Sequence, residues 1–371
     1  GFTDDWEQRK LGELVGIYDG VHQTPDYQDS GIMFLSVENI ATLKSEKYIS
    51  EEAFERDYKV YPEKGDILMT RIGDVGTTNV VETAEKVAFY VSLALLKPNG
   101  IDSYFLSNAM KTNAFQKGLR ERTLVTAIPQ KINKDEIGKI DIFITNNDEE
   151  QKKIGAYFSN LDHLITFHQR KCEQTKKLKK YMLQKMFPKE GQTVPEVRFE
   201  GFTDAWEKRK FGDLGSVSMC KRIFKEQTAT EGDIPFYKIG TFGGEPDAFI
   251  SRALFEEYKE KYQYPEVGDM LISASGTIGR TVEYAGEDAY FQDSNIVWFK
   301  HDDRVDNSFL KCIYSSVKWS GIEGSTIKRL YNDNFLKTEF SMPNAEEQKK
   351  IGEYFQNLDH LITLHQRKYK K

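Results

Sequence analysis

The chain has 371 residues, a formal net charge of −6 and three widely spaced cysteines, so it is long enough for two domains that each bury a core. No stretch approaches the roughly 20 apolar residues of a membrane span, no signal-peptide pattern opens the chain, and no C-x-x-C pair or zinc-type histidine set occurs, which together favour a cytoplasmic protein. The acidic total argues against a protein that coats DNA, although a local basic patch stays compatible with it.

An internal repeat organises the chain, and repeats decide architecture before any other feature. The second helical copy keeps 20 of the 23 residues of the first. The matching segments are Gly1–Leu14 with Gly201–Leu214, Tyr61–Gly76 with Tyr264–Gly279, Asp102–Leu106 with Asp306–Leu310, and Glu149–Lys171 with Glu346–Lys368. The interiors between these segments have diverged almost completely. This pattern fits two modules that share one scaffold but recognise two different targets through different contacts.

Each interior alternates short β-rich runs with helical pieces and Gly, Pro and Asn turns. The runs that we expect to be strands include Asp66–Thr70, Val87–Leu96, Met270–Ser273 and Asn295–Phe299. This composition predicts two globular modules of the α/β (α+β) class, over residues 1–148 and 201–345.

Residues 149–188 are predicted to form one long helix. Asn147 and Glu150 make an N-x-x-E capping box, which Asn344 and Glu347 repeat, and Pro188 ends the helix. Apolar or small residues spaced by four and three predict a coiled-coil seam. The seam runs through Ile154, Phe158, Leu161, Ile165, His168, Cys172, Thr175, Leu178 and Met182. A helix of about 39 residues spans roughly 58 Å.

Residues 189–200 are predicted to be a linker, and residues 346–371 a second helix with the same seam. That helix stops in mid-pattern at Lys371, so we expect the natural chain to be longer there. Two seams are buried most simply against each other, as a pair of long antiparallel coiled-coil helices with a pseudo-twofold repeat. Such a pair would hold the two modules apart and suit a split DNA target with half-sites on the order of 34 Å apart, one duplex turn.

These motifs resemble a known family. The helix pattern at Glu149–Lys171 and Glu346–Lys368, the G-D-x-L box at Tyr61–Thr70 and Tyr264–Ser273, and D-G-x-H-x-T-P at Asp19–Pro25 are similar to specificity subunits of type I restriction-modification systems. The second module lacks the last element at Ser216–Arg222, which we interpret as a different specificity.

The resemblance implies a non-catalytic DNA-binding subunit. Each target-recognition domain would read one half of a bipartite double-stranded sequence, and the helices would set the spacing and dock two methyltransferase subunits. Restriction (translocase) subunits would join that complex. S-adenosylmethionine, ATP and Mg²⁺ would belong to those partners, with no cofactor and no metal in this chain.

Basic and small polar residues on the turns are the candidate DNA contacts, because Lys and Arg grip phosphates while Arg, Asn, Gln, Ser and Thr reach base edges. In the first module they are His22, Thr24, Arg71, Arg120, Arg122, Thr123, Thr126, Gln130 and Lys131. In the second they are Lys221, Arg222, Lys225, Ser275, Arg280, Ser325, Thr326, Lys328 and Arg329. Ordinary solvated surface is the alternative for each of them.

Other motifs keep two interpretations. The G-x-x-G turns at Gly73–Gly76 and Gly276–Gly279 could clamp a phosphate or simply turn the chain. The basic run Lys176–Lys180 is either a solvated face or a phosphate contact. The E-x-K triplets at Glu150–Lys152 and Glu347–Lys349 imitate half of a nuclease motif, but their place in a first helical turn favours capping. Histidines five residues apart (His163 and His168, His360 and His365) do not share a helical face for zinc.

The main competing hypothesis is a coiled-coil interaction scaffold that carries two ligand-binding end modules and does not bind DNA. The negative net charge is its best support. An intrinsic enzyme fits less well, because the sequence contains no Walker A motif, no S-adenosylmethionine-type glycine loop and no [DNS]-P-P-[YFW] tetrapeptide.

Overall fold

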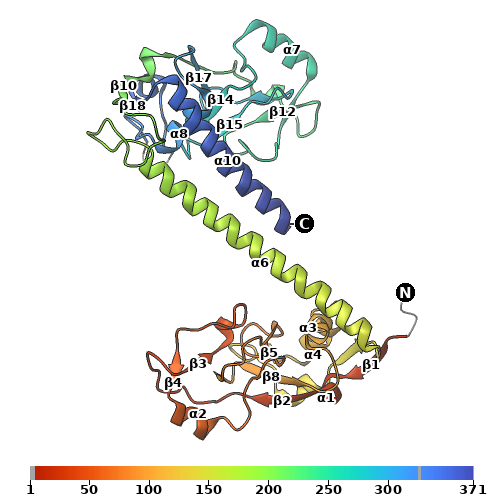
Figure 1. Ribbon diagram of the computed structural model, residues 1–371. Helices are drawn as coiled ribbons and strands as arrows, with labels where there is room; N and C mark the ends of the chain where they lie inside the picture. Colours follow the sequence, from red (N-terminus) through yellow and green to blue (C-terminus); the bar gives the residue numbers. More distant parts are fainter. Residues whose placement is uncertain (1–4, 325–326, 371) are drawn as a thin grey trace. The chain divides into compact units, whose positions relative to one another are not determined.

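The computed structural model describes residues 5–324 and 327–370, and the chain divides into two compact units, Gly1–Thr166 and Phe167–Lys371. Each unit contains one α/β module (Figure 1). The long helix α6 (Asp148–Lys185) contributes its first part to unit 1 and the remainder to unit 2. Within the described ranges, no helix combines the length and the apolar character needed to cross a membrane.

Unit 1 is built on three small sheets. An antiparallel sheet has the order β2-β8-β5-β6, a mixed sheet has the order β4-β3-β7, and β1 pairs with β9. The strands are β1 (Glu7–Lys10), β2 (Val15–Asp19), β3 (Ile32–Leu35), β4 (Tyr48–Ile49), β5 (Ile67–Thr70), β6 (Thr78–Val80), β7 (Val87–Phe89), β8 (Leu93–Pro98) and β9 (Asp141–Ile144). The helices before α6 are α1 (Leu11–Leu14), η1 (Val37–Asn39), α2 (Glu51–Asp57), α3 (Ser103–Ala109), α4 (Asn113–Arg122) and α5 (Lys134–Gly138).

The strand β5 is buried throughout, and its first three residues are apolar, because both of its faces are covered. Side chains of a strand alternate between the two faces of a sheet. Ile67 and Met69 therefore enter the core that contains the helical segments, whereas Leu68 enters the core beneath β3 and β7. The four-stranded sheet thus separates two hydrophobic cores in one module.

Unit 2 repeats this order strand for strand. Its sheets are β11-β17-β14-β15, β13-β12-β16 and β10-β18, the exact counterparts in sequence order of those in unit 1. The strands are β10 (Glu207–Lys210), β11 (Gly215–Ser218), β12 (Ile234–Tyr237), β13 (Phe249–Ile250), β14 (Met270–Ser273), β15 (Thr281–Glu283), β16 (Tyr290–Phe291), β17 (Ile296–His301) and β18 (Glu339–Met342). The helices are η2 (Phe211–Asp213), η3 (Lys225–Gln227), α7 (Arg252–Lys261), α8 (Asn307–Ser316), α9 (Asn332–Lys337) and α10 (Ala345–Lys370).

The predicted α/β class and the two long helices are confirmed, but one expected strand is wrong. Val87–Leu96 forms two strands, β7 and β8, which belong to different sheets. A turn closed by the Leu93 amide on the Tyr90 carbonyl, at 2.9 Å, separates them. Sequence apolarity alone did not reveal this turn because the residues around it are themselves hydrophobic.

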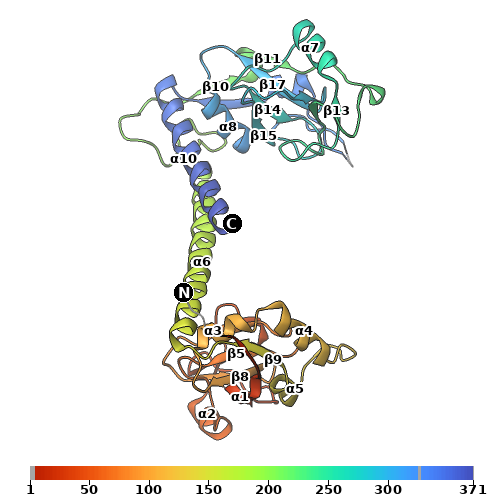
Figure 2. The same cartoon turned by 90° about the vertical axis from the view of Figure 1, so that its right-hand side faces the viewer.

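Within unit 2, the C-terminal half of α6 and α10 lie side by side and run antiparallel (Figures 1 and 2). The Nδ1 atoms of His168 and His365 are 3.0 Å apart, and the Cys172 thiol faces the Ile362 carbonyl one turn further along. Burial, together with the charges of Lys368 and His365, lowers the pKa of His168. The neutral form of the His168 imidazole is therefore favoured.

Of the predicted seam, His168 and Cys172 contact α10, whereas Phe158, Leu161 and Ile165, earlier in α6, are 44%, 36% and 38% exposed. Beyond Cys172 the seam shifts by one residue. Leu178 is 44% exposed, and Lys179 instead faces α10, where its ammonium binds the Asp359 carboxylate. The long lysine side chain can cover apolar surface with its methylenes while its charge is paired. The prediction that Leu178 belongs to the seam is wrong for this reason.

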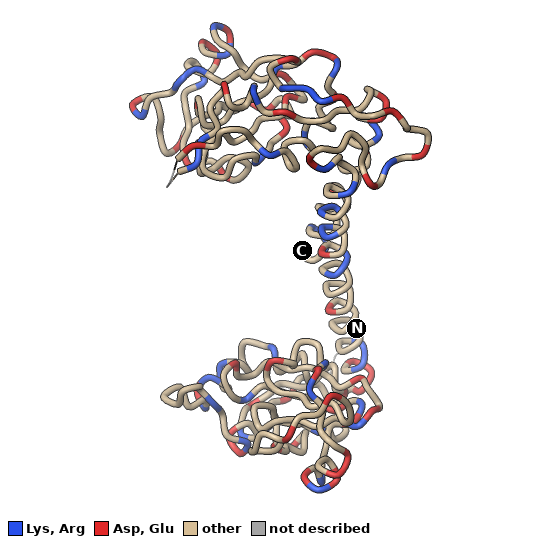
Figure 3. The backbone as a smooth tube through the Cα atoms, turned by 90° about the vertical axis from the view of Figure 1, so that its left-hand side faces the viewer, with Lys and Arg blue, Asp and Glu red and all other residues tan. Residues whose placement is uncertain are grey.

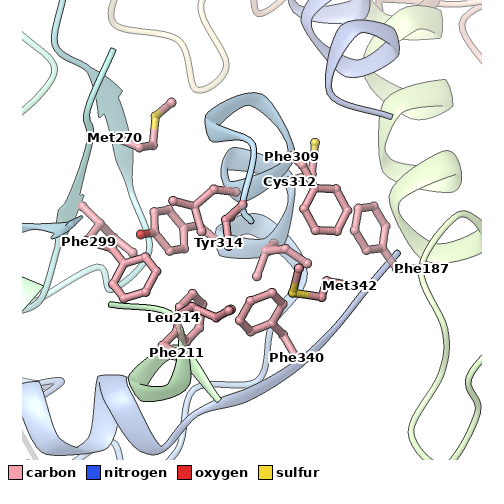
Figure 4. Packing of buried hydrophobic residues seen from close by; sticks show 14 of the residues in the cluster. Phe187, Phe211, Leu214, Met270, Phe299, Phe309, Cys312, Tyr314, Phe340 and Met342 are labelled. Carbon is pink, nitrogen blue, oxygen red and sulfur yellow. The ribbon is translucent and has the colours of Figure 1, made fainter. Parts of the chain in front are cut away.

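Aromatic residues fasten the end of α6 to the module of unit 2 (Figure 4). The Phe187 ring is stacked on Phe309 with centroids 5.8 Å apart, meets Trp206 edge-on at 5.7 Å, and lies 6.2 Å from Phe355 of α10. All of these rings lie in one buried cluster that also holds Ile351 and Leu358 of α10. The helix pair and the module consequently share one core.

The segment between α6 and β10 folds back onto the helices. Glu196 forms ion pairs with Lys185 and Lys189. Arg198 then donates two hydrogen bonds of 2.7 Å to the fully buried Glu347 carboxylate, which raises the pKa of Arg198.

For the predicted capping box of each long helix, the structure confirms the contact of the asparagine side chain but not the return contact of the glutamate side chain. Asn147 accepts from the Glu150 amide at 3.1 Å and Asn344 from the Glu347 amide at 3.0 Å, as predicted. The expected return contact is wrong at Glu347, because its carboxylate is taken by Arg198. In unit 1 the Glu150 Oε2 atom is buried and has no hydrogen-bond partner among the described residues.

Candidate nucleic-acid interface

The first loop of unit 1 that carries candidate residues follows β2. Asp19 pairs with Arg71 at the end of β5, while Val21 exchanges backbone hydrogen bonds with Phe89 and Val91. Gly20 is required here, because a side chain at this position would collide with the Phe89 carbonyl. These contacts fix the backbone of the D-G-x-H-x-T-P element, and the side chains of His22 and Thr24 are exposed to solvent.

A second part of this site is the turn Arg71–Gly76, joined to the segment that follows α4. The Gly73 amide donates to the Gln130 carbonyl and the Gln130 side chain donates to the Gly73 carbonyl, both at 2.9 Å. The Ile132 amide donates to the Arg71 carbonyl at 3.0 Å. We call the Asp19–Thr24 loop, the Arg71–Gly76 turn and the Arg120–Lys131 segment loop cluster 1.

Loop cluster 1 thus brings the candidate residues of the first module together, but it presents them differently. His22, Thr24, Arg120, Thr126, Gln130 and Lys131 are exposed, whereas Arg122 and Thr123 are half-buried. The Arg71 side chain is only 8% exposed and is paired with Asp19. This ion pair connects the loop after β2 to the turn after β5. The low exposure of Arg71 does not support direct DNA contact, which remains a prediction.

In unit 2 the loop after β11 is held by a different ion pair. Arg222 donates to Asp293 at 2.8 Å, and the Lys221 carbonyl accepts from the Tyr290 hydroxyl at 3.1 Å. The Lys221 ammonium lies over the Tyr262 ring, 5.1 Å from its centroid. Lys225, in η3, is exposed.

The turn and the returning segment of unit 2 repeat the backbone arrangement of unit 1. The Gly276 amide donates to the Lys328 carbonyl at 2.9 Å, and the Leu330 amide donates to the Ala274 carbonyl at 2.8 Å. We call the Met219–Lys225 loop, the Ala274–Arg280 turn and the described part of the Glu323–Arg329 segment loop cluster 2. A pocket lined by Met219, Ser294 and Arg329 lies where these loops meet.

The candidates of the second module also differ in how they are presented. Lys221, Arg222, Lys225, Arg280, Lys328 and Arg329 are exposed. Ser275 is buried, and Arg280 donates to the Phe242 carbonyl at 2.9 Å. Ser325 and Thr326 lie outside the described residues.

The G-x-x-G turns have a conformational reason for their first glycine. Gly73 has φ of +82° and Gly276 has φ of +67°, and a side chain at either position would meet no atom within 4 Å. This left-handed backbone favours glycine, and the open space leaves the turn accessible to a ligand. The turn interpretation is sufficient, and phosphate contact remains a prediction.

The remaining motifs serve structural roles in the described residues. Gln151 accepts from the Asp102 amide and donates to the Thr145 carbonyl, and Gln348 makes the corresponding bonds to Asp306 and Pro343. The E-x-K triplets are therefore helix-docking elements. In the described ranges, no three His, Cys, Asp or Glu side chains are placed to share a metal ion.

Charge is mixed over both units. Figure 3 shows Lys and Arg positions interleaved with Asp and Glu positions along the backbone of each unit, with long uncharged stretches between them. Among the residues Lys176, Lys177, Lys179 and Lys180, only Lys179 is half-buried, where it pairs with Asp359. Basic positions are thus interspersed with acidic positions along the backbone of both units.

Sequence reasoning missed the residues that hold these loops and those that form a loop tip. Asp19 and Asp293 are separated from their arginine partners by 52 and 71 positions, a spacing that carries no local signal. Leu124, Val125 and Ile128 are 44%, 70% and 100% exposed. Their apolar character inside an otherwise polar and basic segment was the available signal.

Comparison with known families gives a match over nearly the whole chain. The family described as the type I restriction modification DNA specificity domain matches residues 3–177 and 203–371. Each matched copy contains one module and a long helix, in agreement with the internal repeat.

Individual relatives agree with this match. A putative type I restriction enzyme specificity subunit of Haemophilus influenzae is 58% identical over 158 residues, which are 42% of this chain and 41% of that protein, so this match spans less than half of either chain. The putative MjaX specificity subunit of Methanocaldococcus jannaschii is 23% identical over 97% of this chain and 88% of its own length. The crystal structure of a type I restriction-modification S subunit from M. genitalium superposes with a TM-score of 0.67 at 14% identity, covering 100% of this chain and 93% of the other, and thereby shows the same fold.

Proposed function

Since the chain belongs to the type I restriction-modification DNA specificity family, we propose that it recognises a bipartite double-stranded DNA sequence, with loop cluster 1 reading one half and loop cluster 2 the other. The helices α6 and α10 would set the spacing of the halves and dock methyltransferase subunits. Restriction subunits would join this complex. S-adenosylmethionine, ATP and Mg²⁺ would act in the partner subunits, and the methylation and cleavage chemistry would be theirs.

This proposal rests on one observation: the two modules share a backbone arrangement at the candidate interface but differ in their side chains there. The same two backbone hydrogen bonds join the G-x-x-G turn to the returning segment in both modules. At equivalent positions, Arg71 is replaced by Ala274 and Gln130 by Lys328. Backbone contacts that keep their place while side chains change are what two readers of unlike base sequences require, since base edges are distinguished by side-chain donors and acceptors.

Electrophoretic mobility shift with the assembled methyltransferase complex tests this function. We expect tight binding to a target duplex and a binding constant that falls as salt rises. Arg120→Ala and Lys131→Ala should each reduce the slope of log K against log salt by about 1, if each side chain contacts one phosphate.

The matched control is Lys86→Ala, because Lys86 is an exposed cation paired with Glu55 outside both loop clusters. This variant should keep the original salt slope. Absence of DNA binding in every assembled complex would overturn the proposal and leave the scaffold hypothesis.

A further inference from the structure

An exposed apolar tip occupies the returning segment of loop cluster 1. Leu124, Val125 and Ile128 expose 44%, 70% and 100% of their surface. Single exposed apolar residues are common, but three within five residues on one projecting loop form a patch that is typical of a contact surface. In Figure 2 the segment that follows α4 projects away from the body of unit 1.

The tip is held on a short, fixed hairpin. The Leu124 amide donates to the Lys131 carbonyl at 2.8 Å, and the Ala127 amide donates to the Leu124 carbonyl at 3.3 Å. Gln130 is bound on both its main chain and its side chain to Gly73. A tip that is already ordered loses little conformational freedom when it enters a partner.

The charges around this tip favour an anionic partner. Arg120 and Lys131 are exposed on either side of it, and the sequence contains no Asp or Glu between Glu121 and Asp135. Figure 3 shows the corresponding uncharged stretch next to Lys and Arg positions. An exposed apolar tip between two cations is complementary to duplex DNA, because base pairs have apolar faces and the backbone is negatively charged.

The second module also exposes an isoleucine close to the residue that binds its turn. Ile327 is 59% exposed and directly precedes Lys328, whose carbonyl binds the Gly276 amide. In the first module Ile128 lies two residues before Gln130, whose carbonyl binds the Gly73 amide. The two isoleucines are therefore offset by one position, but each hairpin exposes an isoleucine within two residues of the residue that binds the turn.

We propose that Ile128, supported by Val125, and Ile327 in the second module, insert between neighbouring base pairs of the target duplex. This inference rests on the proposed function of the two loop clusters. Apolar side chains of DNA-binding proteins act as wedges that partly unstack one base step. The energetic cost of opening a step depends on its sequence and is lowest at pyrimidine–purine steps. Each isoleucine would therefore add selectivity at a step where no base edge is contacted.

Fluorescence of 2-aminopurine tests the insertion in the assembled complex, because this base becomes brighter when it is unstacked. The probe is placed in turn at each position of a duplex that carries the methylated target sequence. We expect a rise of several-fold at one step in each half. Ile128→Ser should abolish the rise in one half and weaken binding about tenfold, and Ile327→Ser should abolish the rise in the other half only.

The two variants control each other. Because Ile128 is fully exposed, Ile128→Ser should fold as the original chain does, which circular dichroism checks. Salt-dependent binding without any fluorescence rise, and with Ile128→Ser binding as tightly as the original chain, would overturn the wedge but leave DNA recognition intact. Loss of methyltransferase assembly in Ile128→Ser, with DNA binding unaffected, would also overturn it, since the tip would then be a protein contact. Failure of every complex to bind DNA would instead refute the proposed function itself.

Discussion

Replacement of Phe355 by alanine is expected to lower the free energy of unfolding of unit 2 by about 3–5 kcal/mol. Phe355 is 2% exposed and belongs to the cluster that joins α10, the end of α6 and the module. Its ring lies 6.2 Å from Phe187 and 5.3 Å from Tyr354. Removal of the ring leaves a cavity in a core that three elements share, so the surrounding side chains cannot close it by moving one element.

The repeat supplies a matched control for this variant. Phe158 occupies the equivalent position of the first helical copy, but it is 44% exposed. Phe158→Ala should change stability by no more than about 1 kcal/mol. Denaturant unfolding followed by tryptophan fluorescence measures both, because Trp206, Trp298 and Trp319 lie in unit 2 and Trp6 lies in unit 1. Equal losses for the two variants would contradict the packing described for α10.

Glu347→Ala should destabilise unit 2 by about 3–5 kcal/mol, because it leaves a largely buried arginine without its carboxylate. The Arg198 side chain is 11% exposed, and the side chain of Glu347 is fully buried. The Arg198 Nη1 atom lacks a hydrogen-bond partner among the described residues, and without the carboxylate the guanidinium keeps only the Asp204 carbonyl as an acceptor. The same fluorescence-detected unfolding gives the loss.

Two further variants separate the ion pair from the helix cap. Arg198→Met in the Glu347→Ala background should recover most of the loss, since it removes the unpaired charge. Glu150→Ala, at the equivalent position of unit 1, should cost little or stabilise, because it removes a buried oxygen that has no partner in the described structure. A loss at Glu150 as large as that at Glu347 would show that the cap, and not the ion pair, carries the stability.

The two modules and the two long helices could be predicted from the sequence because an internal repeat and heptad spacing are local patterns, whereas the order of the strands in the sheets could not. In α6, the predicted seam residues His168 and Cys172 contact α10, but Phe158, Leu161 and Ile165 are exposed. The pattern failed at Leu178, where the helix presents Lys179 to Asp359. An apolar-spacing rule cannot anticipate a lysine that packs along a seam with its charge paired across it.

The candidate interface was predictable in its position but not in its roles. Small polar and basic residues in turns identified the segments that form both loop clusters. That Arg71 holds Asp19, and that Ser275 is buried, depends on contacts between strands distant in sequence. Exposure of Ile128 is likewise set by the hairpin to which it belongs, and apolar residues are usually expected inside.

We propose that each module reads its own half of the target. To test this, the interior of the second module, residues 215–342, is replaced by that of a relative with another specificity. The methylated sites are then sequenced in cells that express the complete system. We expect one half of the methylated sequence to change and the other half to stay the same. Retention of both halves, or loss of both in a complex that still methylates DNA, would contradict it.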